Sequence, residues 1–185
     1  MIIFISGGSK SGKSKIAELW ASKLNSKGGR LVYLATMKPY DNEDLKRIEK
    51  HIENREKYNF ITYEIHNNIE NVINNLKKDD TVLLDSVTSL VTNEMFSKEE
   101  VNFNVIDKIL GGIYEISKSI KNLVVVSDYV FSDSIVYDKF TEGFRKNLGV
   151  INREIATKSD IVCESLYENI IIYKGEELLK YEKLI

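Results

Sequence analysis

The sequence has one cysteine, one proline and a net charge of only -2. A single cysteine excludes a disulfide within the chain and gives no cysteine cluster for zinc. Near-neutral charge gives no overall basic field that would attract nucleic acid or an anionic membrane. No apolar run approaches the ~20 residues of a membrane-spanning helix, so we expect no membrane span. The N-terminus lacks a basic region followed by an apolar core, which predicts no signal peptide and a cytoplasmic protein.

The chain also lacks a Gly/Ser-rich linker, a long block of charge and an internal repeat. A length of 185 residues suits one domain with a full core. We therefore expect residues 1–185 to form a single domain. The cysteine, Cys163, follows Ile161 and Val162, and this apolar context predicts a small buried residue rather than a reactive thiol.

Short apolar, β-branched runs alternate with segments of helical length. Runs that are nearly all apolar are typical of strands buried on both faces of a parallel sheet. The expected strands are 2–5, 31–35, 60–65, 81–84, 123–126, 160–162 and 169–173. The expected helices are about 13–27, 42–57, 68–77, 100–120 and 138–157. This order predicts an α/β fold with a mostly parallel sheet flanked by helices, and an antiparallel edge near the C-terminus. Ligands of such sheets bind at the carboxyl ends of the strands.

The most informative motif lies between the first expected strand and helix. Residues 7–14 read Gly-Gly-Ser-Lys-Ser-Gly-Lys-Ser, the pattern of a phosphate-binding loop. Glycines let backbone N–H groups surround a phosphate, and the next helix points its positive end at the same anion. We expect Lys13 to reach the β- and γ-phosphates and the Ser14 hydroxyl to hold Mg²⁺. The residues expected to bind the nucleotide around them are Gly7, Gly8, Ser9, Lys10, Ser11 and Gly12. The alternative is a structural glycine turn.

Asp85 closes the apolar run 82–84. An acidic residue at the end of a buried strand is where a phosphate-loop protein places its second Mg²⁺ contact, directly or through water. The alternative is that Asp85 is the N-cap of a helix that starts at Ser86. The two roles do not exclude each other.

The segment 42–57 combines an apolar stripe with a basic row. Helical spacing predicts that one stripe is buried, formed by Leu45, Ile48 and Ile52. Arg47, His51 and Arg55 are four residues apart and form a row along the same helix. Two flanking arginines disfavour the positive form of His51, and they could hold phosphates beside it. From spacing alone, a solvated basic helix face remains the alternative. The other histidine, His66, is expected in a surface loop.

Several stretches carry a resemblance beyond these patterns. They are residues 5–18, Tyr33-Leu34-Ala35-Thr36, Arg47-Ile48, His51, Arg55, Thr62, Glu64, residues 83–88, Thr92-Asn93, Phe144-Arg145, Gly149, Asn152 and Ala156. In this order and spacing, over about residues 1–173, the chain resembles the bifunctional adenosylcobinamide kinase/adenosylcobinamide-phosphate guanylyltransferase family of cobalamin synthesis. The arginine–histidine–arginine block is more specific than the phosphate loop.

The resemblance implies a two-step activity. A nucleoside triphosphate, ATP or GTP, phosphorylates the hydroxyl of adenosylcobinamide. A histidine, matched here by His51, then attacks the α-phosphate of GTP and passes GMP to the phosphorylated corrinoid. The matching positions place Lys13 with His51 in catalysis, Arg47, Arg55, Glu64 and Asp85 at the nucleotide, and Mg²⁺ on Ser14 and Asp85. The family also implies a RecA-like sheet and a homotrimer.

The chain departs from the family pattern at a few positions. Phe131, Asp133 and Tyr137 stand where two glycines and a proline are usual. Other departures are Glu56 for proline, Tyr58 for tryptophan and Lys146 for aspartate. They motivate an alternative, a phosphate-loop regulatory or assembly protein of the same fold that has lost one or both activities. A RecA-like ATPase that acts on nucleic acid is a third hypothesis, and the near-neutral charge argues against it.

Overall fold

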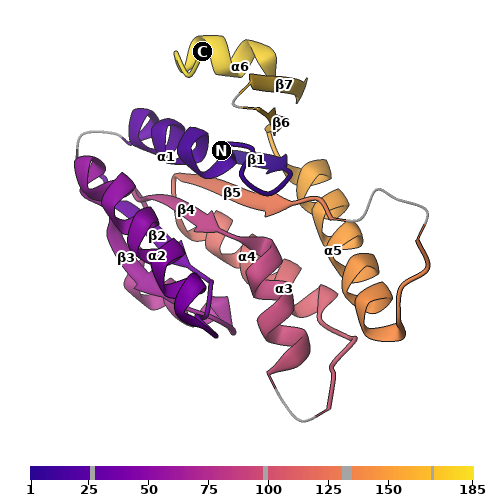
Figure 1. Ribbon diagram of the computed structural model, residues 1–185. Coiled ribbons are helices and arrows are strands. Elements are labelled where there is room, and N and C mark those ends of the chain that lie inside the picture. The colour runs from indigo at the N-terminus through magenta and orange to yellow at the C-terminus, as the bar shows by residue number, and fades with distance from the viewer. Residues whose placement is uncertain (26–27, 98–99, 131–134, 168) are drawn as a thin grey trace.

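The computed structural model describes residues 1–25, 28–97, 100–130, 135–167 and 169–185. The side chains of Arg47 and Asn54 lie outside this description. Within the described chain, seven strands form one sheet in the order β3-β2-β4-β5-β1-β6-β7 (Figure 1). The strands are β1 (Ile2–Gly7), β2 (Leu31–Ala35), β3 (Ile61–Glu64), β4 (Thr81–Asp85), β5 (Asn122–Asp128), β6 (Ile161–Leu166) and β7 (Asn169–Lys174).

The sheet is parallel from β3 to β6, and β7 runs antiparallel to β6. The prediction of an α/β fold with a mostly parallel sheet and an antiparallel C-terminal edge is therefore confirmed. Strand β1 lies between β5 and β6, with Gly7 opposite both Asp128 and Ser165. Because parallel strands end at the same edge, the residues that follow β1, β4 and β5 meet there.

Helices cover both faces of the sheet. Figure 1 shows α3, α4 and α5 on one side and α1 and α6 on the other. The α-helices are α1 (Lys13–Leu24), α2 (Asn42–Arg55), α3 (Val87–Phe96), α4 (Ile106–Ser119), α5 (Lys139–Lys158) and α6 (Glu176–Tyr181). The 3-10 helices are η1 (Glu56–Tyr58) and η2 (Ile69–Asn75).

Alternating side chains of the central strands contribute to two apolar cores. Ile3 and Ile5 of β1 pack in one core with Trp20 of α1. Phe4 belongs to the opposite core, together with Ile113 of α4. This arrangement explains the almost continuous apolar strands, because both faces of the sheet are buried. Cys163 of β6 is 1% exposed, which confirms its predicted burial.

Polar caps define where several helices begin. Asp41 accepts hydrogen bonds from the backbone N–H groups of Glu43 and Asp44, at 2.9 and 2.8 Å, and so starts α2. Ser86 caps α3 by accepting from the N–H of Ser89 at 3.3 Å. Such caps satisfy backbone donors that have no partner inside the helix. Since Ser86 fills this position, the alternative role of Asp85 as the cap is wrong.

Some predicted helices differ from those observed. Helix α4 begins at Ile106 and not near 100, and the segment predicted as helix 68–77 forms the 3-10 helix η2. Helix α3 was not predicted, because two of its buried positions hold the polar residues Asn93 and Glu94, which obscure the apolar period. The asparagine-rich sequence of η2 explains its irregular form, since asparagine side chains compete with helical hydrogen bonds.

The apolar residues of α2 are not buried as predicted. Leu45 and Ile52 are each 47% exposed, and Ile48 is half-buried. The predicted buried stripe is therefore wrong for two of its three members. The α2 sequence has helical periodicity, but Leu45 and Ile48 line a pocket and not a closed core.

Among the described residues, none of the helices is both long and apolar enough to cross a membrane.

Candidate active site

The phosphate-binding loop connects β1 to α1 at the carboxyl edge of the sheet. A Cβ atom at Gly7 would lie 2.6 Å from both Ser11 Oγ and Ser165 O, so only glycine fits there. Gly12 has a φ of 95°, in the left-handed region that favours glycine, and α1 starts directly after it. The Ser165 hydroxyl donates to the carbonyl of Ser11 at 2.8 Å and ties the loop to β6. The sequence pattern thus forms the curved loop that it predicts.

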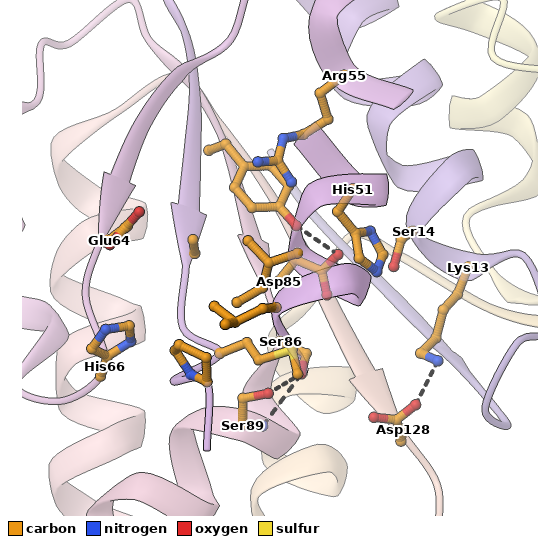
Figure 2. A pocket seen from close by; sticks show the side chains of 16 residues that line it. Lys13, Ser14, His51, Arg55, Glu64, His66, Asp85, Ser86, Ser89 and Asp128 are labelled. Carbon is orange, nitrogen blue, oxygen red and sulfur yellow. Dashed lines mark hydrogen bonds and ion pairs between the residues drawn. The ribbon is translucent and has the colours of Figure 1, made fainter. Parts of the chain in front are cut away.

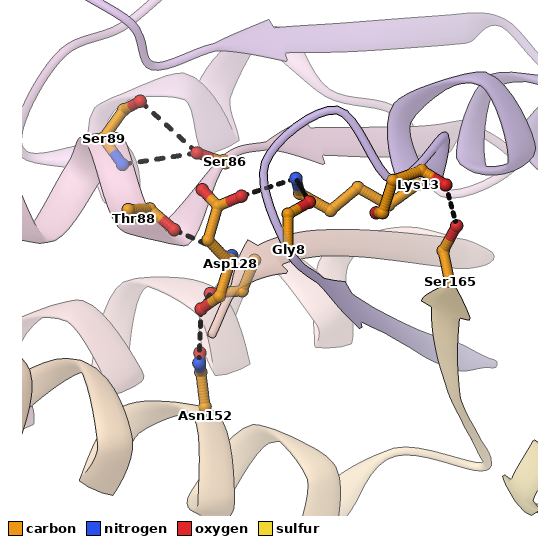
Figure 3. Close-up of polar contacts among 10 residues, drawn as sticks. Gly8, Lys13, Ser86, Thr88, Ser89, Asp128, Asn152 and Ser165 are labelled. Atoms are coloured by element: carbon orange, nitrogen blue, oxygen red, sulfur yellow. Dashed lines mark hydrogen bonds and ion pairs between the residues drawn. The ribbon is translucent and has the colours of Figure 1, made fainter. Parts of the chain in front are cut away.

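Lys13 is buried at the start of α1, with 6% exposure. Its Nζ donates to the carbonyl of Gly8 at 3.1 Å and lies 2.5 Å from the carboxylate of Asp128 (Figure 3). A buried ammonium needs such partners, because loss of water disfavours its charge. The loop therefore directs Lys13 toward the end of β5. There the carboxylate of Asp128 is the counter-ion of the lysine ammonium group.

Asp85 lies at the end of β4, two strands away from β1 in the sheet. Its carboxylate accepts a hydrogen bond from the Tyr33 hydroxyl at 3.0 Å. The guanidinium of Arg55 stacks on the Tyr33 ring, with Cζ 3.6 Å from the ring centroid. Arg55 is 7% exposed. Its cation is thus stabilised by an aromatic face and by nearby negative charge.

Glu18 supplies part of that negative charge. It lies one turn beyond Ser14 on α1 and is 3% exposed. Burial and, after it, the charge of Asp85 raise the pKa of Glu18 to about 7, against the opposing effects of Arg55 and Lys57. Burial and Asp85 also raise the pKa of Tyr33 well above its ordinary value. A cluster of acidic and basic side chains therefore underlies the site on the side of α1.

A pocket of about 270 Å³ joins these groups. Figure 2 shows the side chain of His51, from α2, in this pocket with Lys13, Ser14 and Asp85. The lining residues come from the phosphate loop, four strand ends and helices α2 and α3. They are Lys13, Ser14, Tyr33, Ala35, Met37, Pro39, Leu45, Ile48, His51, Arg55, Glu64, His66, Asp85, Ser86, Ser89 and Asp128.

Glu64 and His66 form the far end of the pocket. Glu64 ends β3, which is separated from β1 by three strands. At the usual strand spacing this distance along the sheet edge is roughly 19 Å. His66 lies in the loop after β3, as predicted, but it is half-buried, with Nδ1 3.3 Å from the carbonyl of Thr36, and it lines the pocket. The pocket is long enough for separate groups of a ligand to lie at its two ends.

Buried hydrogen bonds fix the strand ends under the pocket. The Thr36 hydroxyl donates to the carbonyl of Ser86 and accepts from the Ser86 N–H, each at 2.7 Å. The Asn93 amide donates to the carbonyls of Thr36 at 2.7 Å and His66 at 2.9 Å. These bonds connect the ends of β2, β3 and β4 to α3, and they hold the pocket walls in one arrangement.

Six of the residues predicted for the site line this one pocket: Lys13, Ser14, His51, Arg55, Glu64 and Asp85. The other predicted loop residues, Gly7 to Gly12, surround the start of α1. The side chain of Arg47 is outside the described residues, as are Phe131 and Asp133. The roles of all these residues stay predictions.

Sequence reasoning missed Asp128, Glu18 and His66 as members of the site. A signal for Asp128 was present, because it closes the apolar strand β5 as Asp85 closes β4. No sequence pattern separates Glu18 from an ordinary helical carboxylate, since its burial arises from packing against distant strands.

The donor set fits Mg²⁺ that is bound together with nucleotide phosphates. Within the described ranges, no group of three or more His, Cys, Asp or Glu side chains could hold a metal ion. Mg²⁺ is commonly held by one or two carboxylates while phosphates and water complete its shell. Ser14 and Asp85 line the pocket and offer a hydroxyl and a carboxylate of this kind.

The fold and the site define a nucleotide-binding α/β protein with a phosphate loop. The family model described as "Cobinamide kinase / cobinamide phosphate guanyltransferase" matches residues 3–166, and the chain belongs to this family, CobU. It is 26% identical over 174 residues to the bifunctional adenosylcobalamin biosynthesis protein CobU of Salmonella typhimurium, covering 88% of this chain and 93% of that protein. It is 25% identical to the Escherichia coli protein of the same name, with the same coverage.

The fold also has more distant structural relatives. A solved ATPase domain aligns with a TM-score of 0.54 and 12% sequence identity, over 95% of this chain and 77% of that domain. The flagellar accessory protein FlaH of Methanocaldococcus jannaschii aligns with a TM-score of 0.51 and 13% identity, over 94% of this chain and 77% of that one. At these identities the likeness concerns the fold alone, and it agrees with the predicted RecA-like arrangement of the sheet.

Proposed function

We propose that this protein phosphorylates adenosylcobinamide with a nucleoside triphosphate and then transfers GMP from GTP to the product through a covalent intermediate on His51. The observation that carries the proposal is that His51 lines the same pocket as Lys13 and Ser14 of the phosphate loop. A triphosphate held by the loop would therefore have a nucleophilic side chain within the same enclosed space. The family membership and the named relatives support the choice of substrates.

In the guanylyl transfer, an imidazole nitrogen of His51 attacks the α-phosphorus of GTP. A bond forms between nitrogen and phosphorus, and the bond from this phosphorus to the bridging oxygen breaks, so pyrophosphate leaves. The phosphate of the phosphorylated corrinoid then attacks the same phosphorus and displaces the imidazole. Covalent catalysis of this kind divides one difficult transfer into two easier ones.

Lys13 would neutralise the charge that develops on the phosphates, and backbone N–H groups of the loop would orient them. Ser14 and Asp85 would hold Mg²⁺, which supplies charge neutralisation at the phosphate oxygens when it is bound. Arg55 is braced by Tyr33 and is suited to a fixed position near an anion. We also propose that the enzyme works as a homotrimer in the cytoplasm.

A second candidate is a nucleotide-binding regulatory or assembly protein that retains the fold without one or both activities. The departure at Tyr137 from the family pattern favours it, since this residue lies in the segment that follows β5. It differs from the leading proposal in having no corrinoid turnover.

The decisive experiment supplies adenosylcobinamide, Mg²⁺ and either ATP or GTP, and follows corrinoid products by chromatography and mass spectrometry. We expect the phosphorylated corrinoid with a triphosphate and the GDP-linked corrinoid when GTP is present. Absence of both products from folded, nucleotide-binding protein would favour the regulatory candidate. Hydrolysis that is stimulated by DNA, without corrinoid products, would instead favour the nucleic-acid hypothesis.

A further inference from the structure

Asp128 is a carboxylate at the centre of the site that the steps above do not use. It ends β5, between β4 with Asp85 and β1 with the phosphate loop. Its backbone N–H donates to the Thr88 hydroxyl at 2.8 Å, and its carbonyl accepts from the Asn152 amide at 3.1 Å (Figure 3). Both backbone groups are thus fixed by helices packed on one face of the sheet, and the side chain is directed to Lys13.

The contact with Lys13 defines where Asp128 lies relative to a bound triphosphate. The two side chains are 2.5 Å apart, and they are 8% and 18% exposed for Lys13 and Asp128. A phosphate-loop lysine contacts the oxygens of the β- and γ-phosphates. Since Asp128 contacts the same nitrogen, its carboxylate lies beside the place where these phosphate oxygens would bind. A bound triphosphate and Asp128 compete for the same cation.

The other carboxylates of the pocket are less suited to act at the γ-phosphate. Asp85 accepts from the Tyr33 hydroxyl and lies near the Arg55 cation. Glu64 is on the edge strand β3, which is separated from β5 by β2 and β4. Asp128, by contrast, loses its ion pair with Lys13 when phosphates bind this lysine. It also lines the open pocket from which an acceptor would arrive.

We propose that Asp128 is the general base of the phosphoryl-transfer step, a role that rests on the proposed function. Its carboxylate takes the proton from the acceptor hydroxyl as that oxygen attacks the γ-phosphorus. The oxygen–phosphorus bond forms, the bond from the γ-phosphorus to the β–γ bridging oxygen breaks, and the nucleoside diphosphate leaves with that electron pair. The proton remains on Asp128 until it passes to solvent.

The proposal makes two opposite predictions for one substitution. Asp128→Asn keeps the size of the side chain but removes the negative charge and the basic oxygen. Because the competing anion is gone, we expect nucleotide to bind about 2- to 5-fold more tightly, the range for a partly exposed ion pair. Because the base is gone, we expect transfer of γ-labelled phosphate to adenosylcobinamide to fall by about 10²- to 10⁴-fold in kcat.

The test compares wild type, Asp128→Asn, Asp128→Glu and the exposed control Asp107→Asn. Three quantities are measured: nucleotide affinity, transfer of γ-label to the corrinoid, and attachment of α-label from GTP to the protein. We expect Asp128→Asn to lose only the γ-transfer, Asp128→Glu to recover part of it, and Asp107→Asn to match wild type. Circular dichroism checks that each variant is folded. If Asp128→Asn does not fold, Asp128→Glu is used for the test. For Asp128→Glu we expect a reduced kcat and an unchanged affinity for nucleotide.

Other outcomes overturn the assignment. Full γ-transfer by Asp128→Asn excludes a general base, and nucleotide binding that weakens in parallel with transfer shows that Asp128 only positions Lys13. A large rise in the Mg²⁺ concentration needed for transfer would make it a metal-holding group. If wild type transfers no γ-phosphate to the corrinoid, the proposed function itself fails, and this result differs from a loss confined to Asp128→Asn.

Discussion

Glu18 connects the protonation of a buried side chain to the stability of the whole fold. It is 3% exposed in the layer between α1 and the sheet. Its pKa is raised from 4.5 to about 7, mainly by burial and then by the charge of Asp85. Glu18→Gln keeps the shape of the protonated side chain and cannot ionise. We expect this substitution to stabilise the protein at high pH.

The direction of this stability change follows from the number of protons bound in the folded and unfolded states. Between pH 4.5 and about 7 the folded protein keeps a proton on Glu18 that the unfolded chain loses. The stability due to the protonated group is therefore complete below pH 4.5 and is lost as the pH rises to about 7. At 1.36 kcal/mol per pH unit the whole difference is about 3 kcal/mol. Part of it is already lost at pH 5, so Glu18→Gln should gain about 2 to 3 kcal/mol over wild type between pH 5 and pH 8.

Urea unfolding followed by far-UV circular dichroism at pH 5 and pH 8 measures this gain. EDTA and the absence of nucleotide keep ligand binding out of the comparison. Glu115→Gln, on an exposed position of α4, is the matched control and should show no pH-dependent gain. If wild type and Glu18→Gln lose stability equally from pH 5 to pH 8, Glu18 does not retain its proton in the folded state and the reasoning fails.

Three further predictions concern binding, folding and reactivity. Lys13→Ala should weaken triphosphate binding by about 10- to 100-fold, because a charge-assisted contact to phosphate is lost, and unchanged affinity by calorimetry would exclude a phosphate-loop role. Asp80, 1% exposed, accepts from Arg30 Nε at 3.0 Å, so Asp80→Asn should cost about 3 kcal/mol of unfolding free energy. The partners of Asp80 lower its pKa, so wild type should lose its extra unfolding free energy below about pH 4. An equal loss of stability in Asp80→Asn would contradict this expectation. Burial raises the pKa of Cys163 to about 12, so thiol reagents at pH 8 should label it only after unfolding, and rapid labelling of the folded protein would refute its burial.

The sheet could be predicted from the sequence because its strands are short, nearly all apolar and separated by helical segments. The phosphate loop was equally accessible, since Gly7, Gly12, Lys13 and Ser14 have fixed spacing and a local structural role. Asp85 was found by the same logic, as the acidic end of a buried strand. Each of these signals is carried by neighbouring residues, and each appears in the structure where it was expected.

The remaining features depend on contacts between distant segments. Helix α3 has the polar residues Asn93 and Glu94 at two of its buried positions, so its sequence does not show a clear apolar stripe. Glu18 acquires its raised pKa only when α1 packs against β4 and β5. The partner of Lys13 is Asp128, 115 positions later in the chain, and only the adjacency of β1 and β5 brings them together.

Helix α2 shows the limit of periodicity as a guide to burial. Its apolar spacing predicts a helix over about 42–57, and the structure has an α-helix over Asn42–Arg55. The same spacing does not tell whether the apolar face meets a core or a pocket, and here Leu45 and Ile48 line the pocket beside His51. The helix that carries the proposed nucleophile is thus placed over the binding site and not in the protein interior.

The most direct measurement of the proposed chemistry is the attachment of GMP to the protein. Wild type is incubated with α-labelled GTP and Mg²⁺, quenched under alkaline denaturing conditions in which a phosphoramidate survives, and examined for bound label and for a mass increase on the peptide with His51. The account predicts label on wild type and none on His51→Ala, while His66→Ala keeps it. Undiminished labelling of folded His51→Ala would contradict the assignment of His51 as the nucleophile.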